Sequence, residues 1–201
     1  MKHIRLSKEN IDNIDLSNLV KYVEFDESCA KHFLLPLGKE PFKLIAYLST
    51  VLDSPVLYDV GTDKGLEALA LSYNSDKKVV TYDIYDYIPE DTNRDIRQKP
   101  NIKRKITNVL NDIDDIVQSD LIVLDLKTYD GLIQYEIIDA LSKNGYKGLL
   151  LIDDIKLSQE MWTLWNDIEH TKFDISDLGH WSGTGLVVFD DSRFQVTVDA
   201  V

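Results

Sequence analysis

Cysteine and positive charge are both scarce in this sequence. Cys29 is the single cysteine among 201 residues, so no intramolecular disulfide can form and a disulfide-stabilised scaffold is excluded. The 22 lysines and arginines face 35 aspartates and glutamates, which gives a formal net charge of −13 at pH 7. That balance argues against broad nucleic-acid binding, because phosphates need clustered Lys and Arg. No apolar run approaches a membrane span, and residues 1–10 lack the apolar core of a signal peptide. We therefore expect a soluble cytoplasmic protein.

Composition and periodicity indicate an α/β protein. Hydrophobic residues make up 44% of the chain and charged residues 28%, which is ordinary for a globular protein, and the length suits one domain. Short apolar runs, typical of buried strands, alternate with segments whose apolar residues recur at helical spacing. We expect strands at residues 56–60, 78–82, 102–106, 120–126, 148–155, 172–176 and 185–190. We expect helices at residues 40–52, 67–73, 113–117, 132–141 and 159–170.

The order of these elements predicts the sheet. Strands that alternate with helices favour a mainly parallel sheet with helices on both faces. The link at residues 176–185 is too short for a helix, so the last two strands should pair antiparallel. The expected fold is Rossmann-like, with a mostly parallel seven-stranded sheet and a C-terminal antiparallel hairpin. Residues 194–198 alternate weakly, which would suit a further edge strand.

A glycine-containing turn joins the first expected strand to the next helix. The segment reads DVGTDKG at residues 59–65, and Gly61 and Gly65 would let the backbone approach a ligand closely. Asp83 ends the following strand, where its carboxylate can accept hydrogen bonds from ribose hydroxyls. Ligands of open parallel sheets bind at the carboxyl ends of the strands. These residues therefore predict a nucleoside site, with a tight turn that binds nothing as the alternative.

The same turn discriminates between two cofactor classes. A dinucleotide fingerprint needs G-x-G-x-x-G, whereas this turn has Thr62 and Asp63 and no middle glycine. Asp63 would also repel a pyrophosphate, and Asp59 with Asp63 suits a cationic ligand end. S-adenosylmethionine carries an ammonium and a sulfonium. A nicotinamide-dependent oxidoreductase and a noncatalytic nucleoside-binding domain remain as alternatives.

From about residue 42 to residue 190 the sequence resembles the class I S-adenosylmethionine-dependent methyltransferases. DVGTDKG looks like the first motif of that family, D/E-x-G-T-x-x-G, and Asp83 looks like its ribose-binding acidic residue. The resemblance implies S-adenosylmethionine as cofactor, cradled by the turn of Asp59, Gly61, Thr62 and Gly65. It also implies an adenine contact from Asn108. It divides the chain into an N-terminal arm with one helix, residues 1–40, and a methyltransferase domain, residues 41–201, which together form one domain.

The nearest branch in appearance includes catechol and caffeoyl-coenzyme A O-methyltransferases. That branch has Asp at the end of its fourth strand and Asp-Asn or Asp-Asp at the end of its fifth, which resembles Asp125 and Asp153-Asp154 here. The resemblance implies methylation of an oxygen, or of a nitrogen as the alternative, on a small-molecule or sugar-like acceptor. The chain departs from the branch at Glu67, where serine is usual, and at Lys127, a cation beside the expected site.

The carboxylates at the strand ends are candidate metal ligands. Asp125, Asp153 and Asp154 should lie on one rim, and clustered oxygen ligands suit Mg²⁺ or Ca²⁺. Such an ion would lower the pKa of an acceptor hydroxyl. Alternatively, Asp153 or Asp154 caps the next helix, Asp125 faces the methyl or ammonium group of the cofactor, or Lys127 neutralises the cluster without metal.

A glycine-rich loop at residues 179–185 carries the last candidates. His180 titrates near neutral pH and is a candidate general base, so that we assign catalytic roles to Asp125 and His180. Trp181 and Tyr129 are expected to line the substrate pocket, and His32 could join them; in the alternative, Trp181 packs over the end of the sheet. The expected partner is a small-molecule substrate, and the sequence leaves a homodimer open.

Overall fold

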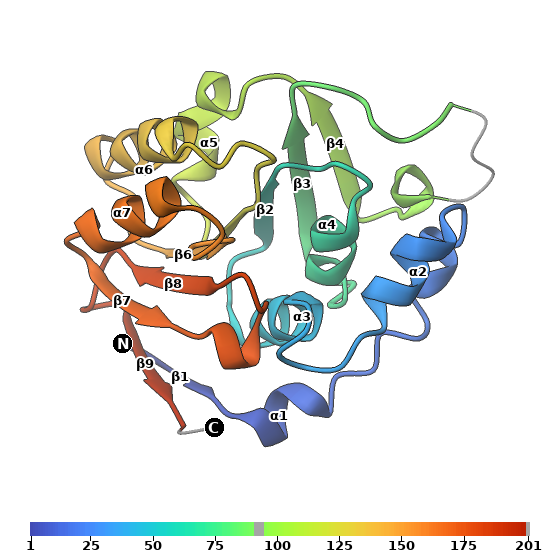
Figure 1. Ribbon diagram of the computed structural model, residues 1–201, viewed down its shortest axis with the longest axis horizontal. Coiled ribbons are helices and arrows are strands. Elements are labelled where there is room, and N and C mark those ends of the chain that lie inside the picture. Colours follow the sequence, from blue (N-terminus) through green and yellow to red (C-terminus); the bar gives the residue numbers. More distant parts are fainter. Residues whose placement is uncertain (91–94, 200–201) are drawn as a thin grey trace.

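The computed structural model describes residues 1–90 and 95–199. Its centre is a seven-stranded sheet in the order β4-β3-β2-β5-β6-β8-β7 (Figure 1). Parallel pairing joins β4, β3, β2, β5 and β6, while β8 runs antiparallel to both β6 and β7. The predicted parallel sheet with its C-terminal antiparallel hairpin is therefore confirmed. The strands are β2 Val56–Val60, β3 Lys78–Asp83, β4 Ile102–Ile106, β5 Leu121–Leu124, β6 Leu149–Asp153, β7 Thr171–Asp174 and β8 Thr184–Val188.

Helices cover both faces of this sheet, as its apolar central strands require. Every residue of β5 and of β6 is buried, which is typical of parallel strands covered on both sides. Successive residues of a strand point to opposite faces, so Leu57 joins one hydrophobic cluster and Tyr58 the other. One face is covered by α3 Phe42–Val51 and α4 Leu66–Leu71 (Figure 1). The other is covered by α5 Ile113–Ile116, α6 Leu132–Lys143 and α7 Gln159–Asp167.

The two ends of the chain form a small sheet of their own. β1 Lys2–Leu6 pairs parallel with β9 Phe194–Val198 in register from Lys2–Phe194 to Leu6–Val198. Residues 194–198 therefore do not extend the main sheet as the edge strand we expected. Ile4 and Phe194 are buried in the hydrophobic cluster that also contains α3, and this burial favours pairing of the two termini with each other.

The first 40 residues contain more structure than the single helix expected. Besides β1 they form α1 Lys8–Asp12, α2 Glu27–Phe33 and a short 3₁₀-helix at Val20–Tyr22. Local capping starts both helices: the Ser7 hydroxyl accepts a hydrogen bond from Asn10 N in α1, and the Asp26 carboxylate accepts from Ser28 N in α2. Side chains of β1, α1 and α2 lie in the same hydrophobic cluster as α3. The division of the chain at residue 40 stays a prediction.

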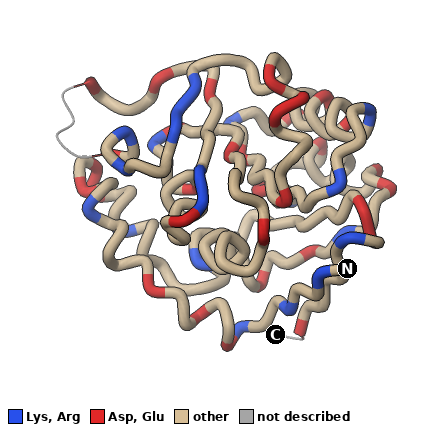
Figure 2. The backbone as a smooth tube through the Cα atoms, turned by 180° about the vertical axis from the view of Figure 1, so that it is seen from behind, with Lys and Arg blue, Asp and Glu red and all other residues tan. Residues whose placement is uncertain are grey.

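Charged residues of both signs are scattered along the backbone among the other residues, and β4 carries a run of three Lys and Arg residues (Figure 2). Within the described residues, the longest helices are too short or too polar to cross a membrane.

Candidate functional site

A cavity of about 520 Å³ opens where the carboxyl ends of β2, β3, β5 and β6 meet. Its walls come from the loops that follow these four strands and β4, from α2, α6 and the segment before α3, and from the loop before β8. This is the edge of the sheet where the sequence places its candidate residues. Four of the seven predicted cofactor contacts line the cavity: Gly61, Asp83, Asn108 and Asp125.

Gly61 is required by the close approach of two strand ends. Its φ of +108° is a left-handed conformation that favours glycine, and a Cβ there would overlap the backbone oxygen of Asp125. Asp125 N also donates a hydrogen bond to Val60 O at 3.0 Å. The turn thus brings the end of β2 against the end of β5, which places Asp125 beside Gly61 in the cavity wall.

Asp59, Thr62 and Gly65 lie behind the wall and do not line the cavity. Asp59 is fully buried and accepts a hydrogen bond of 2.5 Å from Thr81 Oγ1, which also lies 2.5 Å from Thr62 Oγ1. Burial raises the pKa of Asp59 to about 7, against the opposing effect of the Thr81 hydroxyl. The predicted contacts of these three residues with the cofactor stay a prediction. Gly65 starts α4 with a φ of +88° and packs against Ile96.

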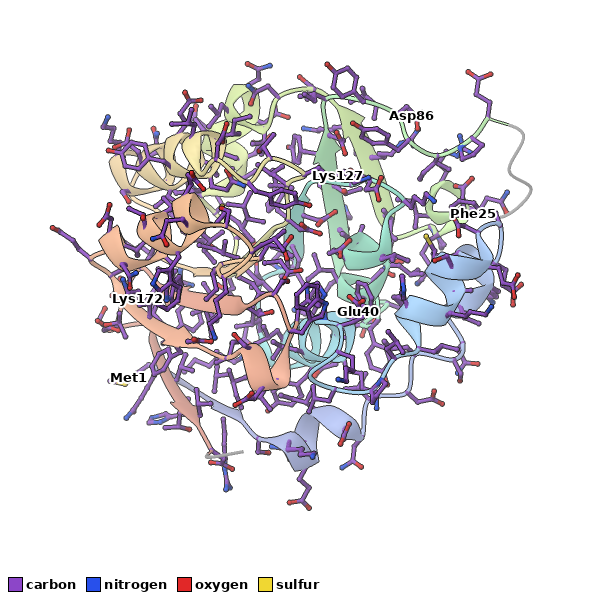
Figure 3. The ribbon with its side chains drawn as sticks, viewed as in Figure 1. Met1, Phe25, Glu40, Asp86, Lys127 and Lys172 are labelled. Carbon is purple, nitrogen blue, oxygen red and sulfur yellow. The ribbon has the colours of Figure 1, made fainter. Side chains whose placement is uncertain are left out.

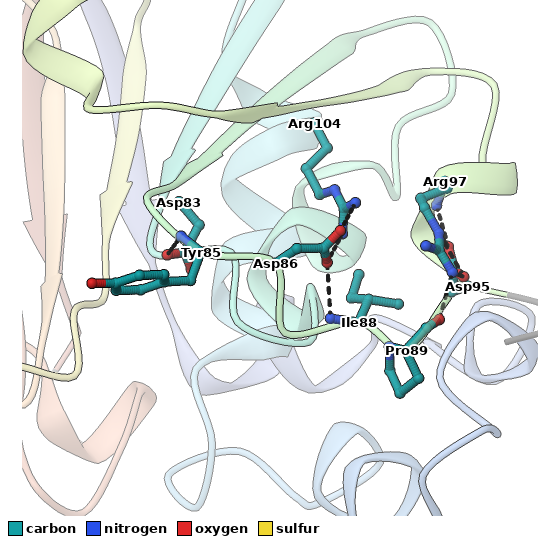
Figure 4. Close-up of polar contacts among 8 residues, drawn as sticks. All are labelled: Asp83, Tyr85, Asp86, Ile88, Pro89, Asp95, Arg97 and Arg104. Atoms are coloured by element: carbon teal, nitrogen blue, oxygen red, sulfur yellow. Dashed lines mark hydrogen bonds and ion pairs between the residues drawn. The ribbon is translucent and has the colours of Figure 1, made fainter. Parts of the chain in front are cut away.

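Asp83 is fixed at the cavity by backbone donors. Its Oδ1 accepts from Tyr85 N at 3.1 Å (Figure 4). Its Oδ2 accepts from Asp63 N at 3.0 Å. The loop beyond it is held by two hydrogen bonds of 2.6 Å from the Arg104 guanidinium to Asp86. A carboxylate has about four acceptor positions, so Asp83 keeps capacity for two ligand hydroxyls.

Lys127 lines the cavity and pairs with Asp63 instead of the carboxylates at the strand ends. Its Nζ donates to Asp63 Oδ1 at 2.7 Å and lies 5.0 Å from the centre of the Tyr87 ring. The hydrogen bond to Asp63 raises the pKa of Lys127. Figure 3 shows Lys127 and Glu40 at different parts of the central region. The alternative in which Lys127 pairs with Asp125, Asp153 and Asp154 is therefore not what the structure shows.

The cation beside Asp153 and Asp154 is His180. Its Nδ1 lies 3.3 Å from Asp153 Oδ2 and 3.6 Å from Asp154 Oδ1, and 2.7 Å from the Ser182 hydroxyl, which also hydrogen-bonds Asp154. Its Nε2 lies 3.8 Å from Glu40 Oε2. Burial alone would lower the pKa of His180, but hydrogen bonds to both aspartates and the charge of Glu40 raise it to about 10. A pKa this high favours the protonated imidazole at neutral pH, which argues against His180 as general base; the predicted role stays a prediction.

The metal-ligand geometry differs from the predicted triad. Asp153, Asp154 and His180 each offer one ligand atom, and these atoms lie within 4.8 Å of one another. Asp125 lines the same cavity but lies outside that group. Burial and the charges of Asp153 and Asp154 raise the pKa of Asp125 well above its ordinary value. The predicted ion at Asp125, Asp153 and Asp154 stays a prediction.

The two predicted substrate-pocket residues have different positions. Tyr129 lines the cavity, as does His32. Trp181 is 70% exposed and lies outside the cavity wall. Its neighbour His180 contacts Asp153 and Asp154, whereas the Trp181 side chain points to solvent. The two rings lie edge to face, with their centres 5.5 Å apart. The predicted contact of Trp181 with the substrate stays a prediction.

Sequence reasoning missed several cavity residues. Glu40 precedes α3 and is far from His180 in sequence, so no local pattern connects them. Tyr85 lies two residues after Asp83, just beyond the end of the same strand. Its place in the sequence could therefore have predicted that it lines the cavity. Glu67 stood out only as a departure from the family pattern, and the structure places it in the cavity wall.

Comparison with known proteins identifies the fold. No protein-family model matches the chain, and no curated protein matches it. Among solved structures, a methyltransferase from Geobacter sulfurreducens matches with a TM-score of 0.61 at 13% identity, over 88% of this chain and 90% of that one. A Podospora anserina methyltransferase bound to S-adenosylhomocysteine has a TM-score of 0.61 at 14% identity, over 86% and 88%. An O-methyltransferase from Bacillus cereus in complex with S-adenosylhomocysteine has a TM-score of 0.59 at 13% identity, over 88% and 92%.

The chain has the fold of these methyltransferases. At 13–14% identity the likeness concerns the fold alone, which is the one that the sequence resemblance predicted. What the site can bind must be argued from its own residues.

The cavity is strongly acidic. Its lining carries seven carboxyl side chains: Glu40, Asp63, Glu67, Asp83, Asp125, Asp153 and Asp154. Its two lysines are both paired with carboxylates, Lys64 with Asp26 and Lys127 with Asp63. Such a lining favours a ligand that carries positive charge and disfavours one that carries phosphates.

Proposed function

We propose that this protein is an S-adenosylmethionine-dependent methyltransferase that methylates an oxygen atom of a small molecule. One observation carries the proposal: an acidic cavity, with Asp83 fixed in its wall, lies at the carboxyl ends of the strands in a methyltransferase fold. A cofactor with an ammonium and a sulfonium suits this lining. The two phosphates of a dinucleotide would face seven carboxyl groups, which argues against the oxidoreductase alternative.

The cavity residues fit the parts of such a cofactor. Asp83 would accept hydrogen bonds from the two ribose hydroxyls. Asn108 and the neighbouring Val109 line the side of the cavity beyond β4, where the adenine would lie. Gly61 and Asp125 line the side toward β5, where the amino-acid end would lie. The buried hydroxyl oxygen of Thr128 also lacks a partner among the described residues, and it could bond a ligand in this cavity.

The chain would contribute mainly alignment and charge. When bound, the cofactor supplies a methyl group that an acceptor oxygen displaces in line from the sulfonium. The enclosing walls would hold the acceptor in line and keep water away. Asp125 and the group of Glu40, His180, Asp153 and Asp154 provide acceptor and donor positions for its hydroxyl. Because His180 is already protonated, a carboxylate of this group is the better candidate to take the acceptor proton.

A metal-dependent version of the reaction is a second proposal. The oxygens of Asp125, Asp153 and Asp154 are of the type that Mg²⁺ and Ca²⁺ prefer. In the structure, however, the His180 imidazolium lies where it can compensate Asp153 and Asp154 without an ion. Chelation separates the two versions. If an ion is needed, EDTA abolishes turnover and Mg²⁺ restores it, whereas turnover that persists in EDTA supports compensation by His180.

The proposed activity can be tested by turnover with acceptors that differ in their nucleophile. S-adenosylmethionine is incubated with phenols, sugars and amines, and formation of S-adenosylhomocysteine and of the methylated product is measured. We expect methylation of an oxygen acceptor. Methylation of amines alone would contradict the oxygen assignment. Tight cofactor binding without turnover of any acceptor would favour a noncatalytic nucleoside-binding domain.

A further inference from the structure

A segment of the N-terminal region, residues 26–40, contributes to the cavity wall from outside the sheet. It consists of α2 and the chain that leads to α3, and we call it the strap. His32 and Glu40 of the strap line the cavity. Phe25, just before the strap, and Glu40, at its end, are labelled in Figure 3. No strand of the sheet carries the strap, so other contacts must fix its position.

Ion pairs connect both ends of the strap to other residues of the cavity. At its start, the Asp26 carboxylate pairs with the Lys64 ammonium, and Lys64 lies in the turn after β2 and lines the cavity. At its end, Glu40 Oε2 lies 3.8 Å from Nε2 of His180 in the loop before β8. The strap thus bridges the turn after β2 and the loop before β8.

Asp26 uses its two carboxylate oxygens for different contacts. Its Oδ1 accepts from Ser28 N at 2.9 Å and from Cys29 N at 3.1 Å, which caps α2. Its Oδ2 contacts Lys64, and the hydrogen bond from Lys64 lowers the pKa of Asp26 to about 2. Asp26 itself does not line the cavity. An effect of Asp26 on a ligand must therefore pass through the strap or through Lys64.

The strap contributes to the side of the cavity that the nucleoside leaves free. Glu40 lies beside His180, which contacts Asp153 at the end of β6. Asp83, the expected ribose contact, ends β3, and the strand order places β2 and β5 between β3 and β6. With the nucleoside at Asp83, the space beside Glu40 is the part of the cavity that remains for the acceptor.

We propose that Asp26 is a positioning residue for the acceptor: through Lys64 it holds the strap against the turn at residues 59–65, so that cofactor binding at this turn stabilises the wall formed by His32 and Glu40. This inference rests on the proposed function. It couples the cofactor and acceptor sites through a residue that contacts neither ligand. A cofactor that orders the strap reduces the ordering that acceptor binding still requires.

Hydrogen exchange tests this coupling without an acceptor. Amide exchange of α2 and of the turn at residues 59–65 is measured by mass spectrometry, with and without saturating S-adenosylhomocysteine. Asp26→Asn is the test variant, because asparagine caps a helix as well as aspartate does but offers no charge to Lys64. Glu27→Gln is the matched control, since it removes an exposed ion pair with Lys31 in the same helix.

In the wild-type protein and the control, S-adenosylhomocysteine should slow exchange in the turn and also in α2. The slowing in α2 should be about two- to fivefold, the range of one partly exposed ion pair. In Asp26→Asn the turn should still be protected, whereas the slowing in α2 should fall below about 1.5-fold.

Kinetics with an acceptor that the turnover assay identifies provide the second readout. Asp26→Asn should raise the KM for the acceptor about two- to fivefold and leave kcat unchanged within about 1.5-fold. The dissociation constant of S-adenosylhomocysteine should change less than about twofold, because Asp26 does not line the cavity. A merely structural role would lower kcat through loss of folded protein and leave KM unchanged.

Equal slowing of α2 exchange in Asp26→Asn and in the wild-type protein would overturn the inference, and so would an unchanged acceptor KM. Protection of the turn without protection of α2 in the wild-type protein would also overturn it, but would leave the cofactor site intact. If S-adenosylhomocysteine protects neither segment in the wild-type protein, the proposed function itself fails.

Discussion

Two groups of acids line the same cavity, and they are compensated differently. Asp153 and Asp154 have a cation built into the fold, because His180 lies within 3.6 Å of both. Burial and negative neighbours raise the pKa values of Glu67 and Asp125 well above their ordinary values, although the charge of His180 opposes the shift at Asp125. The negative charge of the first group is therefore compensated within the protein. In the second group the net effect of the surroundings still opposes ionisation, so a positively charged ligand would stabilise it.

The largest expected effect comes from removing the cation of the first group. His180→Gln would leave Asp153 and Asp154 uncompensated, and the free energy of unfolding at pH 6 should fall by about 3–5 kcal/mol. The pKa of His180 is about 10 when folded and 6.5 in its ordinary state. Its stabilising contribution is therefore complete below about pH 6.5 and is lost as the pH rises toward 10.

Urea unfolding at pH 6 and at pH 9.5 measures this difference. The loss caused by His180→Gln should be clearly larger at pH 6, and His3→Gln, at an exposed position, should show little effect at either pH. An equal loss at both pH values would mean that His180 stabilises the protein by packing and not by its charge.

Replacing Asp59, a buried acid whose charge acts on Glu67 and Asp125, should increase the free energy of unfolding. Burial raises the pKa of Asp59 from 3.8 to about 7, so its ionisation destabilises the folded protein as the pH rises through that interval. Asp59→Asn removes this cost and should raise the free energy of unfolding at pH 8 by about 2–4 kcal/mol. Near pH 4 the gain should vanish. Denaturant unfolding across this range checks it, and a variant less stable than the wild type at pH 8 would contradict it.

Asp83 tests the cofactor site without disturbing either acidic group. Asp83→Ala removes a carboxylate that is expected to accept from two ribose hydroxyls, and each lost charge-assisted bond is worth about 1.5–3 kcal/mol. Affinity for S-adenosylhomocysteine, measured by calorimetry, should fall at least about tenfold. Asp114→Ala, at an exposed position of α5, is the control. An unchanged dissociation constant in a folded Asp83→Ala variant would place the ribose elsewhere.

The smallest effect is expected at Lys127. Its side chain is 63% exposed, and it pairs with Asp63, which belongs to neither of the two acidic groups. Lys127→Ala should therefore lower the free energy of unfolding by less than about 1 kcal/mol. Denaturant unfolding measures it. A loss above about 2 kcal/mol would show that Lys127 compensates the buried acids after all.

The regular part of the fold could be predicted because its signals are local. Apolar runs such as the one before Asp125 mark buried strands, and parallel strands bring their carboxyl ends to one edge. For that reason Asp83, Asp125, Asp153 and Asp154 could be assigned to one rim from the sequence.

Contacts between distant segments could not be predicted in this way. β1 pairs with β9 across almost the whole chain, and Glu40 lies beside His180, although neither pairing has a local pattern. Nor does a sequence show which carboxylate a lysine selects, as Lys127 and Asp63 illustrate. Asp59 and Thr62 belong to the expected motif but lie behind the wall, because the turn points them at Thr81.

The central claim is that the acidic cavity binds a cationic nucleoside cofactor and not a dinucleotide. Calorimetric titration of the wild-type protein with S-adenosylhomocysteine, and separately with NAD, tests it most directly. The account predicts saturable binding of S-adenosylhomocysteine with one site per chain, and no binding of NAD at the same concentrations. Saturable binding of NAD without a signal for S-adenosylhomocysteine would contradict it.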